Sequence, residues 1–119
     1  MIPKRRKAGK MGCRAKGVVR CAAHLKWIRG FYCCVCSMTD AQSQPSPTEA
    51  AHVRLGTDGG MGMKPGDNWT IPLCSDHHRE QHQIGEASFQ ERYQIESIPT
   101  AEKFWTNSPA GRKWRLHNE

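Results

Sequence analysis

Nine residues, CSDHHREQH at positions 74–82, decide the fold because two metal-binding spacings overlap in them. Cys74 and His77 are three residues apart, and Cys33 and Cys36 form a second pair with the same spacing upstream. Thiolates and imidazoles at these short spacings are typical ligands of a closed, tetrahedral structural zinc site. We therefore expect Cys33, Cys36, Cys74 and His77 to hold one structural zinc ion.

A second metal position is expected on the other side of the same segment. His78 and His82 are four residues apart, a spacing that stacks two side chains on one face of an α-helix. That face points away from the one that carries His77. One short helix would thus hold a structural ion on one side and present a second ion to solvent on the other.

The order of these motifs resembles that of the HNH superfamily, the ββα-metal or His-Me finger endonucleases. Their pattern runs from a cysteine pair to a strand that ends in histidine, then a loop, a second strand and a metal-binding helix. Here the corresponding pieces are Cys33-x2-Cys36, residues 49–54 with His52, residues 69–74, and His78-x3-His82. The glycine-rich residues 59–67, followed by Pro-Leu-Cys and His-His, are similar to a prophage-encoded branch that includes phage recombination-enhancement nucleases. The resemblance covers roughly residues 22–106.

The resemblance implies a fold and a chemistry. The fold would be α+β, a small zinc-stabilised ββα-metal finger with flanking short helices. The activity would be metal-dependent hydrolysis of DNA phosphodiester bonds by a phage or prophage endonuclease. His52 would act as the general base, while His78 and His82 would hold a catalytic divalent cation, Mg²⁺, Mn²⁺ or Zn²⁺. DNA would be the main partner, with a recombination protein as a second.

The sequence departs from the fuller pattern immediately before His52. Many relatives carry a histidine or aspartate there as a third metal ligand, whereas this chain has Ala51. Asp67 or Asn68 could take the place of the motif's middle asparagine, which binds metal or braces the loop, and we favour Asp67. A water molecule or a substrate phosphate could equally fill the position, because a catalytic ion needs open sites.

The positive charge is concentrated at the N-terminus. The formal net charge is +7, yet residues 1–30 hold ten of the eighteen Lys and Arg residues and no acid, so residues 31–119 carry −3. A basic arm suits phosphate backbones through counterion release, and the alternative is a solubilising tail. The expected phosphate contacts are Lys4, Arg5, Arg6, Lys7, Arg54 and Arg79, although the last two could merely solvate the surface.

The expected layout is a disordered basic arm (1–21), the HNH domain (22–106) and a C-terminal tail (107–119). Periodicity and turn residues predict three kinds of element inside the domain. These are helices over 22–29, 86–95 and 100–105, strands over 48–55 and 69–73, and a metal helix that Ser75 or Asp76 caps and Gly85 ends.

Cysteine usage and hydropathy indicate a compartment. The chain has six cysteines, of which Cys33, Cys36 and Cys74 lie at metal-site spacings. No apolar stretch follows the basic N-terminus as in a secretory signal. No apolar run approaches the length of a membrane span. We expect a protein of the bacterial host cytoplasm without a membrane partner, with Cys13 and Cys21 as free thiols.

Two other classes of function stay open at this point. A zinc-stabilised nucleic-acid-binding module without catalysis would use the same helix and arm to grip phosphates, and Ala51 is its best support. A purely structural zinc protein that serves protein contacts would leave His52, His78 and His82 without a role.

Overall fold

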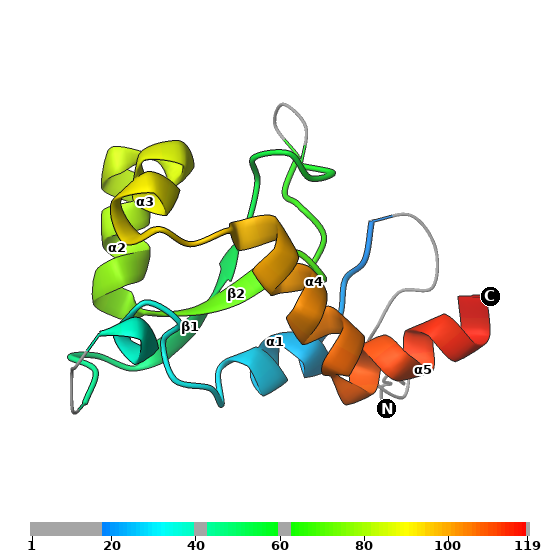
Figure 1. Cartoon of the computed structure of the whole chain (residues 1–119). Helices are drawn as coiled ribbons and strands as arrows, with labels where there is room; N and C mark the ends of the chain where they lie inside the picture. The colour runs from blue at the N-terminus through cyan, green and yellow to red at the C-terminus, as the bar shows by residue number, and fades with distance from the viewer. Residues whose placement is uncertain (1–17, 40–42, 60–62, 119) are drawn as a thin grey trace, which may run out of the picture.

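The structure is a computed structural model that describes residues 18–39, 43–59 and 63–118 (Figure 1). The predicted phosphate contacts at Lys4, Arg5, Arg6 and Lys7, and the thiol of Cys13, lie outside the described residues.

The described chain forms an α+β unit with one two-stranded sheet and five α-helices, which confirms the predicted fold class at this level. The elements in chain order are α1 (Ala22–Ile28), η1 (Cys36–Met38), β1 (Thr48–His52), β2 (Thr70–Cys74), α2 (Ser75–Ile84), α3 (Glu86–Tyr93), α4 (Ser97–Asn107) and α5 (Pro109–Asn118). None of the described helices is long and apolar enough to cross a membrane.

The two strands form an antiparallel hairpin. Thr48 lies opposite Cys74 and His52 lies opposite Thr70, so the strand that ends in histidine finishes at the loop end of the hairpin. Every residue of β2 is buried, whereas only Ala51 of β1 is. A two-stranded hairpin is marginally stable alone, so the helices that pack on β2 supply most of its support.

The main core lies between this sheet and helices α2, α3 and α4. Its largest members are fully buried aliphatic and aromatic side chains from β2, α3 and the adjoining loops: Ile71, Leu73, Phe89, Val35 and Val53. Burial of these apolar surfaces is the main stabilising contribution outside the metal cluster described below.

The start of α2 is capped differently from the sequence prediction. Cys74 is the N-cap residue, and its side chain makes no capping hydrogen bond. Ser46 in the preceding loop caps the helix instead, because its hydroxyl accepts a hydrogen bond from the Asp76 backbone N–H at 3.0 Å. The Ser75 N–H donates to the Pro47 carbonyl at 3.0 Å. The predicted caps at Ser75 and Asp76 are therefore wrong, since a distant loop satisfies the same groups.

Gly85 makes the reversal between α2 and α3 possible. Its φ of 92° and ψ of 155° end α2 and begin α3 without an intervening loop. L-residues with a side chain rarely adopt that conformation, so the predicted helix stop at Gly85 is confirmed with a physical reason.

The folded unit begins before residue 22. Val19 is buried, and its carbonyl accepts a hydrogen bond from the Asp67 N–H at 2.8 Å. Arg20 donates to the carbonyls of Lys64 and Pro65 at 2.9 Å and 2.8 Å. Cys21 is fully buried and disulfide-bonded, so the predicted free thiol at this position is wrong. Residues 19–21, assigned to the arm from sequence, thus pack against the loop between the strands.

The segment predicted as a C-terminal tail forms helix α5. It packs on α4 and α1, and its Gly111 approaches α4 so closely that a Cβ atom there would lie 1.9 Å from the Trp105 carbonyl oxygen. Val19, Cys21 and Ala110 form a second, smaller core beneath this helix.

His24 on α1 is a buried histidine without a role in the sequence patterns. Its ring stacks on Trp27 at a centroid distance of 5.8 Å and meets Trp105 edge-on at 4.8 Å. Neither ring nitrogen has a hydrogen-bond partner among the residues that the structure describes. Burial lowers the pKa of His24 to about 4, against a weaker opposing effect of the Asp67 charge.

The neutral burial of His24 predicts acid sensitivity. In the unfolded chain the imidazole takes up a proton near pH 6.5, whereas in the folded protein it does so only near pH 4. The contribution of His24 to the free energy of unfolding is therefore fully present above about pH 6.5 and declines as the pH falls toward 4. In urea unfolding, the free energy of unfolding of the wild type should fall by about 1 kcal/mol relative to that of His24→Leu when the pH is lowered from 7.5 to 5.5. Parallel pH dependence of the two proteins would contradict this explanation.

Candidate metal centre and neighbouring histidine sites

Four side chains meet in a metal-binding cluster. The Nδ1 atom of His77 lies 3.5 Å from the Cys33 Sγ atom, 3.6 Å from Cys36 Sγ and 3.2 Å from Cys74 Sγ. The sulfur atoms of Cys36 and Cys74 are 4.0 Å apart, and all four ligand atoms lie within 4.8 Å of one another. Tetrahedral zinc bound to sulfur and nitrogen separates its ligands by about 3.5 to 3.8 Å. The cluster can therefore hold a metal ion such as zinc.

Three elements bring these ligands together. Cys33 lies in the turn before η1 and Cys36 is the first residue of η1, while Cys74 ends β2 and His77 lies in the first turn of α2. The Cys34 N–H donates to the Pro72 carbonyl at 2.9 Å, which fixes the turn to β2. The two-residue spacer thus places two sulfur atoms beside the end of the strand, while helical phase turns His77 toward them.

The environment of the thiols favours a bound cation. Cys33, Cys36 and Cys74 are buried next to one another. Burial, together with the neighbouring Cys33 and Cys74 sulfurs, raises the pKa of Cys36 to about 12. Several buried thiolates repel one another unless a metal ion compensates their charge, so the ligand set suits a divalent ion. The half-buried Cys34, whose pKa burial also raises to about 12, contributes no ligand to the cluster.

The opposite face of α2 carries the second histidine pair. The Nε2 atoms of His78 and His82 lie 3.2 Å apart, and their rings are 4.8 Å apart between centroids. Two nitrogens bound to one ion at about 2.1 Å stand about 3.0 to 3.4 Å apart, depending on the coordination geometry. The pair is thus spaced for a shared ion, as the i, i+4 pattern predicts.

Glu49 orients this pair from the neighbouring strand. Its Oε1 atom lies 2.7 Å from His78 Nδ1, and its Oε2 atom accepts a hydrogen bond from the Ser75 hydroxyl at 2.8 Å. The His78 contact, followed by that of Ser75, lowers the pKa of Glu49. A carboxylate on Nδ1 fixes the ring and directs Nε2 outward, an arrangement common behind metal-bound histidines.

His52 belongs to a separate polar group at the other end of β1. Its Nε2 atom lies 2.9 Å from Asp67 Oδ1, and the Cys21 backbone N–H donates to Asp67 Oδ2 at 2.7 Å. The side chain of His52 is 19% exposed and that of Asp67 is 5% exposed. Burial alone would raise the pKa of Asp67, but the His52 and Cys21 hydrogen bonds and the nearby Arg20 lower it overall.

The structure does not bring all predicted metal ligands into one group. Within the described parts of the chain, Cys33, Cys36, Cys74 and His77 are the one set of three or more potential ligands that lie together. Asp67 bonds to His52 instead of joining the pair on α2, which fits the loop-bracing alternative of its two predicted roles. Ala51 is fully buried in the core and offers no ligand.

The two arginines predicted to contact phosphate differ in their surroundings. Arg54 donates from its guanidinium to the Met63 carbonyl and from its backbone to Glu86, so it braces the loop between the strands. Arg79 is two-thirds exposed on α2, with Asp76 at 3.9 Å. Arg79 therefore has more freedom to reach a ligand.

Glu49 is the functional candidate that sequence reasoning missed. A signal was present in the sequence. Side chains alternate along a strand, so Glu49 lies on the same face as Ala51, the position at which many HNH enzymes have a third metal ligand. Its contact with His78 depends on how α2 lies across the hairpin, which no local pattern specifies.

Comparison with known proteins places the chain in a family. Residues 14–103 match the family described as "Protein of unknown function (DUF968)". The chain belongs to this family. It is also 32% identical over 78 residues to "Uncharacterized protein YdfU" of Escherichia coli (strain K12), an alignment that covers 63% of this chain. The chain spans about a fifth of that relative's length, 20%. No solved structure gives a significant match.

Removal of the metal should unfold the domain. Because metal binding in such small units is largely folding free energy, a strong chelator should abolish the native circular dichroism and the melting transition. Cys74→Ala should do the same and purify without stoichiometric zinc. Cys34→Ala is the matched control and should keep both zinc and the native melting temperature. Retention of native structure by the chelated protein would contradict a structural role for the cluster.

Proposed function

We propose that this protein is a metal-dependent DNA endonuclease of the HNH type, with His52 as the general base. The observation that carries the proposal is the 2.9 Å hydrogen bond between His52 Nε2 and the buried Asp67 carboxylate. It gives the histidine at the end of β1 a fixed orientation and tautomer, as a general base requires.

The hydrogen bonds assign the protons of this pair. An ionised Asp67 accepts from His52 Nε2–H, so Nδ1 is the atom that can take a proton from water. Once His52 is protonated, the adjacent negative charge of Asp67 stabilises the imidazolium. The orientation of the Asp67 carboxylate is fixed in turn, because its second oxygen accepts a hydrogen bond from the Cys21 N–H. Asp67 acts here as a positioning residue, whereas His52 would contact the attacking water.

The pair on α2 supports a metal-dependent reaction. His78 and His82 have the right separation for one ion, and Glu49 holds His78 in place. A divalent cation bound there would stabilise negative charge on the phosphate and on the departing oxygen. With two protein ligands it would keep open positions for phosphate oxygens, which suits a catalytic ion better than a structural one.

The order of the elements adds support by analogy. The cysteine turn, β1, the loop, β2 and α2 follow one another as in the ββα-metal finger, with zinc proposed at the Cys33, Cys36, Cys74 and His77 cluster. The basic N-terminal sequence and the net charge of +7 suit a polyanionic substrate. A recombination protein as second partner rests on the resemblance alone.

Ala51 favours a second candidate function, a zinc-stabilised nucleic-acid-binding module without catalysis. This residue stands where many HNH enzymes have a third metal ligand, and Ala51, which is fully buried, has no ligand atom. In that case His78, His82 and Arg79 would contact phosphates directly.

Cleavage assays distinguish the two candidates. Supercoiled plasmid and single-stranded DNA should be cut when Mg²⁺, Mn²⁺ or Zn²⁺ is added, and His52→Ala should lower the rate by at least about 100-fold. Added imidazole should restore part of the lost rate, which a purely structural role for His52 would not allow. The control is DNA binding and zinc content, both of which His52→Ala should retain. Cutting by His52→Ala at the wild-type rate would exclude this mechanism, and DNA binding without any cleavage would favour the non-catalytic module.

A further inference from the structure

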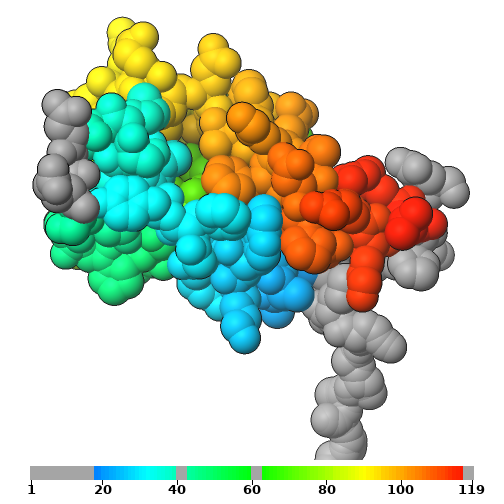
Figure 2. All heavy atoms as spheres, turned by 60° about the horizontal axis from the view of Figure 1, so that its bottom comes forward, coloured from blue at the N-terminus to red at the C-terminus, as the bar shows by residue number. Residues whose placement is uncertain are grey.

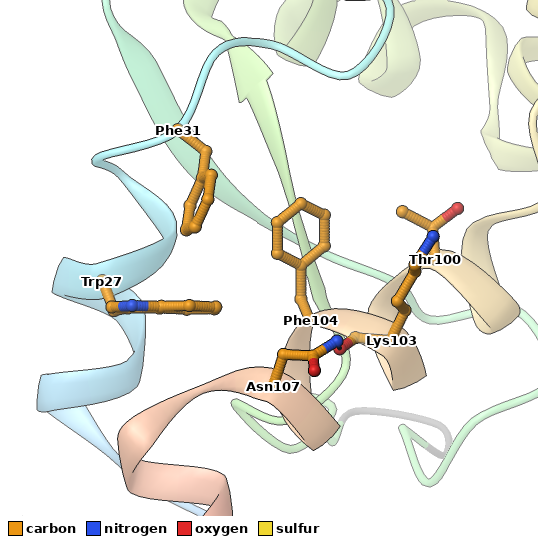
Figure 3. A pocket seen from close by; sticks show the side chains of 6 residues that line it. All are labelled: Trp27, Phe31, Thr100, Lys103, Phe104 and Asn107. Atoms are coloured by element: carbon orange, nitrogen blue, oxygen red, sulfur yellow. Dashed lines mark hydrogen bonds between the residues drawn. The ribbon is translucent and has the colours of Figure 1, made fainter.

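An aromatic hollow lies between α1 and α4, built from residues that the proposed reaction does not use. Figure 3 shows Trp27 and Phe31 on one side, and Phe104 with Thr100, Lys103 and Asn107 of α4 on the other. The hollow has a volume of about 400 Å³. In the space-filling view α1 and α4 lie side by side on one face of the molecule (Figure 2).

The three rings form a fixed aromatic surface. The centroid of Phe31 lies 4.6 Å from that of Trp27 and 5.1 Å from that of Phe104, and both contacts are edge-on. The backbone of Phe31 is held at both ends, since its N–H donates to the Ile28 carbonyl and its carbonyl accepts from the Thr48 hydroxyl. Phe31 as a whole residue nevertheless stays 38% exposed. A preorganised ring that remains exposed beside a hollow favours a ligand with a flat apolar face.

The polar side chains that line the hollow are positive or neutral. Lys103 is the charged residue of its lining, which contains no Asp or Glu. The Asn107 amide nitrogen donates to the Lys103 carbonyl at 2.8 Å, which leaves the amide oxygen for a ligand. Lys26 is exposed on α1, the helix that carries Trp27, and Arg29 is exposed directly after it. The lining therefore combines ring surfaces, an amide and a cation, which matches a ligand with a planar polar ring and an attached anion.

A nucleotide within a single DNA strand has this combination. Its base offers a π-face for stacking, its edge offers hydrogen-bonding groups, and its phosphate complements Lys103. Within a duplex the base faces are covered by neighbouring pairs, so an aromatic hollow distinguishes unpaired bases from paired ones. We propose that the hollow between α1 and α4 binds an unpaired DNA base, with Phe31 and its neighbouring rings as the stacking surface and Lys103 on the adjacent phosphate. This inference rests on the proposed function for the identity of the polymer.

Binding measured without added divalent metal tests the inference. The probes are a fluorescent oligothymidylate and an abasic strand of the same length, with fluorescence anisotropy as the readout. Phe31→Ala should weaken oligothymidylate binding at least about fivefold, since base stacking on an aromatic ring contributes about 1 to 3 kcal/mol. Binding of the abasic strand should not change. Tyr32→Ala is the matched control, because Tyr32 is the neighbouring aromatic residue, is 41% exposed and does not line the hollow.

Lys103→Gln tests the phosphate contact in the same assay. This substitution should weaken the binding of both strands to the same degree. It should also lower the magnitude of the slope of log affinity against log salt concentration by about one. Zinc content and circular dichroism of each variant establish that the fold is retained.

Three results would overturn the inference: equal affinity of the wild type for the two strands, equal losses in Phe31→Ala and Tyr32→Ala, or no binding of either strand. The proposed nuclease function fails separately, in the plasmid assay. Equal affinity for both strands in a protein that cuts DNA would contradict the base-binding site but not the nuclease function. Base-dependent binding without cleavage would contradict the nuclease function but not the base-binding site.

Discussion

The meeting of three sulfur atoms and one imidazole nitrogen within 4.8 Å is the constraint on which the rest of the structure depends. It joins the turn at residues 33–36, the end of β2 and the first turn of α2 at one point. The sheet has two strands and the chain 119 residues, so the apolar core is small. A metal ion bound at this junction would supply the fixed geometry that such a core does not provide alone.

The orientation of α2 follows from that junction and determines where the helix face that carries His78 and His82 lies. When His77 points at the sulfur atoms, the next residue lies about 100° further around the helix. His78 and His82 must then lie on a different side of α2, and β1 brings Glu49 to His78. One short helix thereby separates a closed ligand set from an open one. His52, the proposed general base, stands outside both, at the loop end of β1, where it bonds to Asp67, whose second oxygen accepts from the Cys21 N–H.

Much of this arrangement could be predicted because it depends on local spacing. The cysteine turn, the phase of His77 against His78 and His82, and the strand that ends at His52 all follow from residues a few positions apart. The partners of these groups could not be predicted, since they depend on long-range contacts. His52 meets Asp67 across the whole hairpin loop, and Cys21 reaches Asp67 over 46 residues of sequence. Helix α5 was missed because its Pro109 and Gly111 are typical of loops, although Gly111 is required by the close approach to Trp105.

The division of work between His52 and the pair on α2 is tested most directly by titration of Mn²⁺ into zinc-loaded protein, followed by electron paramagnetic resonance. If His52 activates water while His78 and His82 hold the ion, His82→Ala should weaken Mn²⁺ binding at least about tenfold. His52→Ala should bind Mn²⁺ as the wild type does. A loss in His52→Ala as large as that in His82→Ala would show that His52 is a metal ligand, filling the place that Ala51 leaves, and would contradict its assignment as the general base.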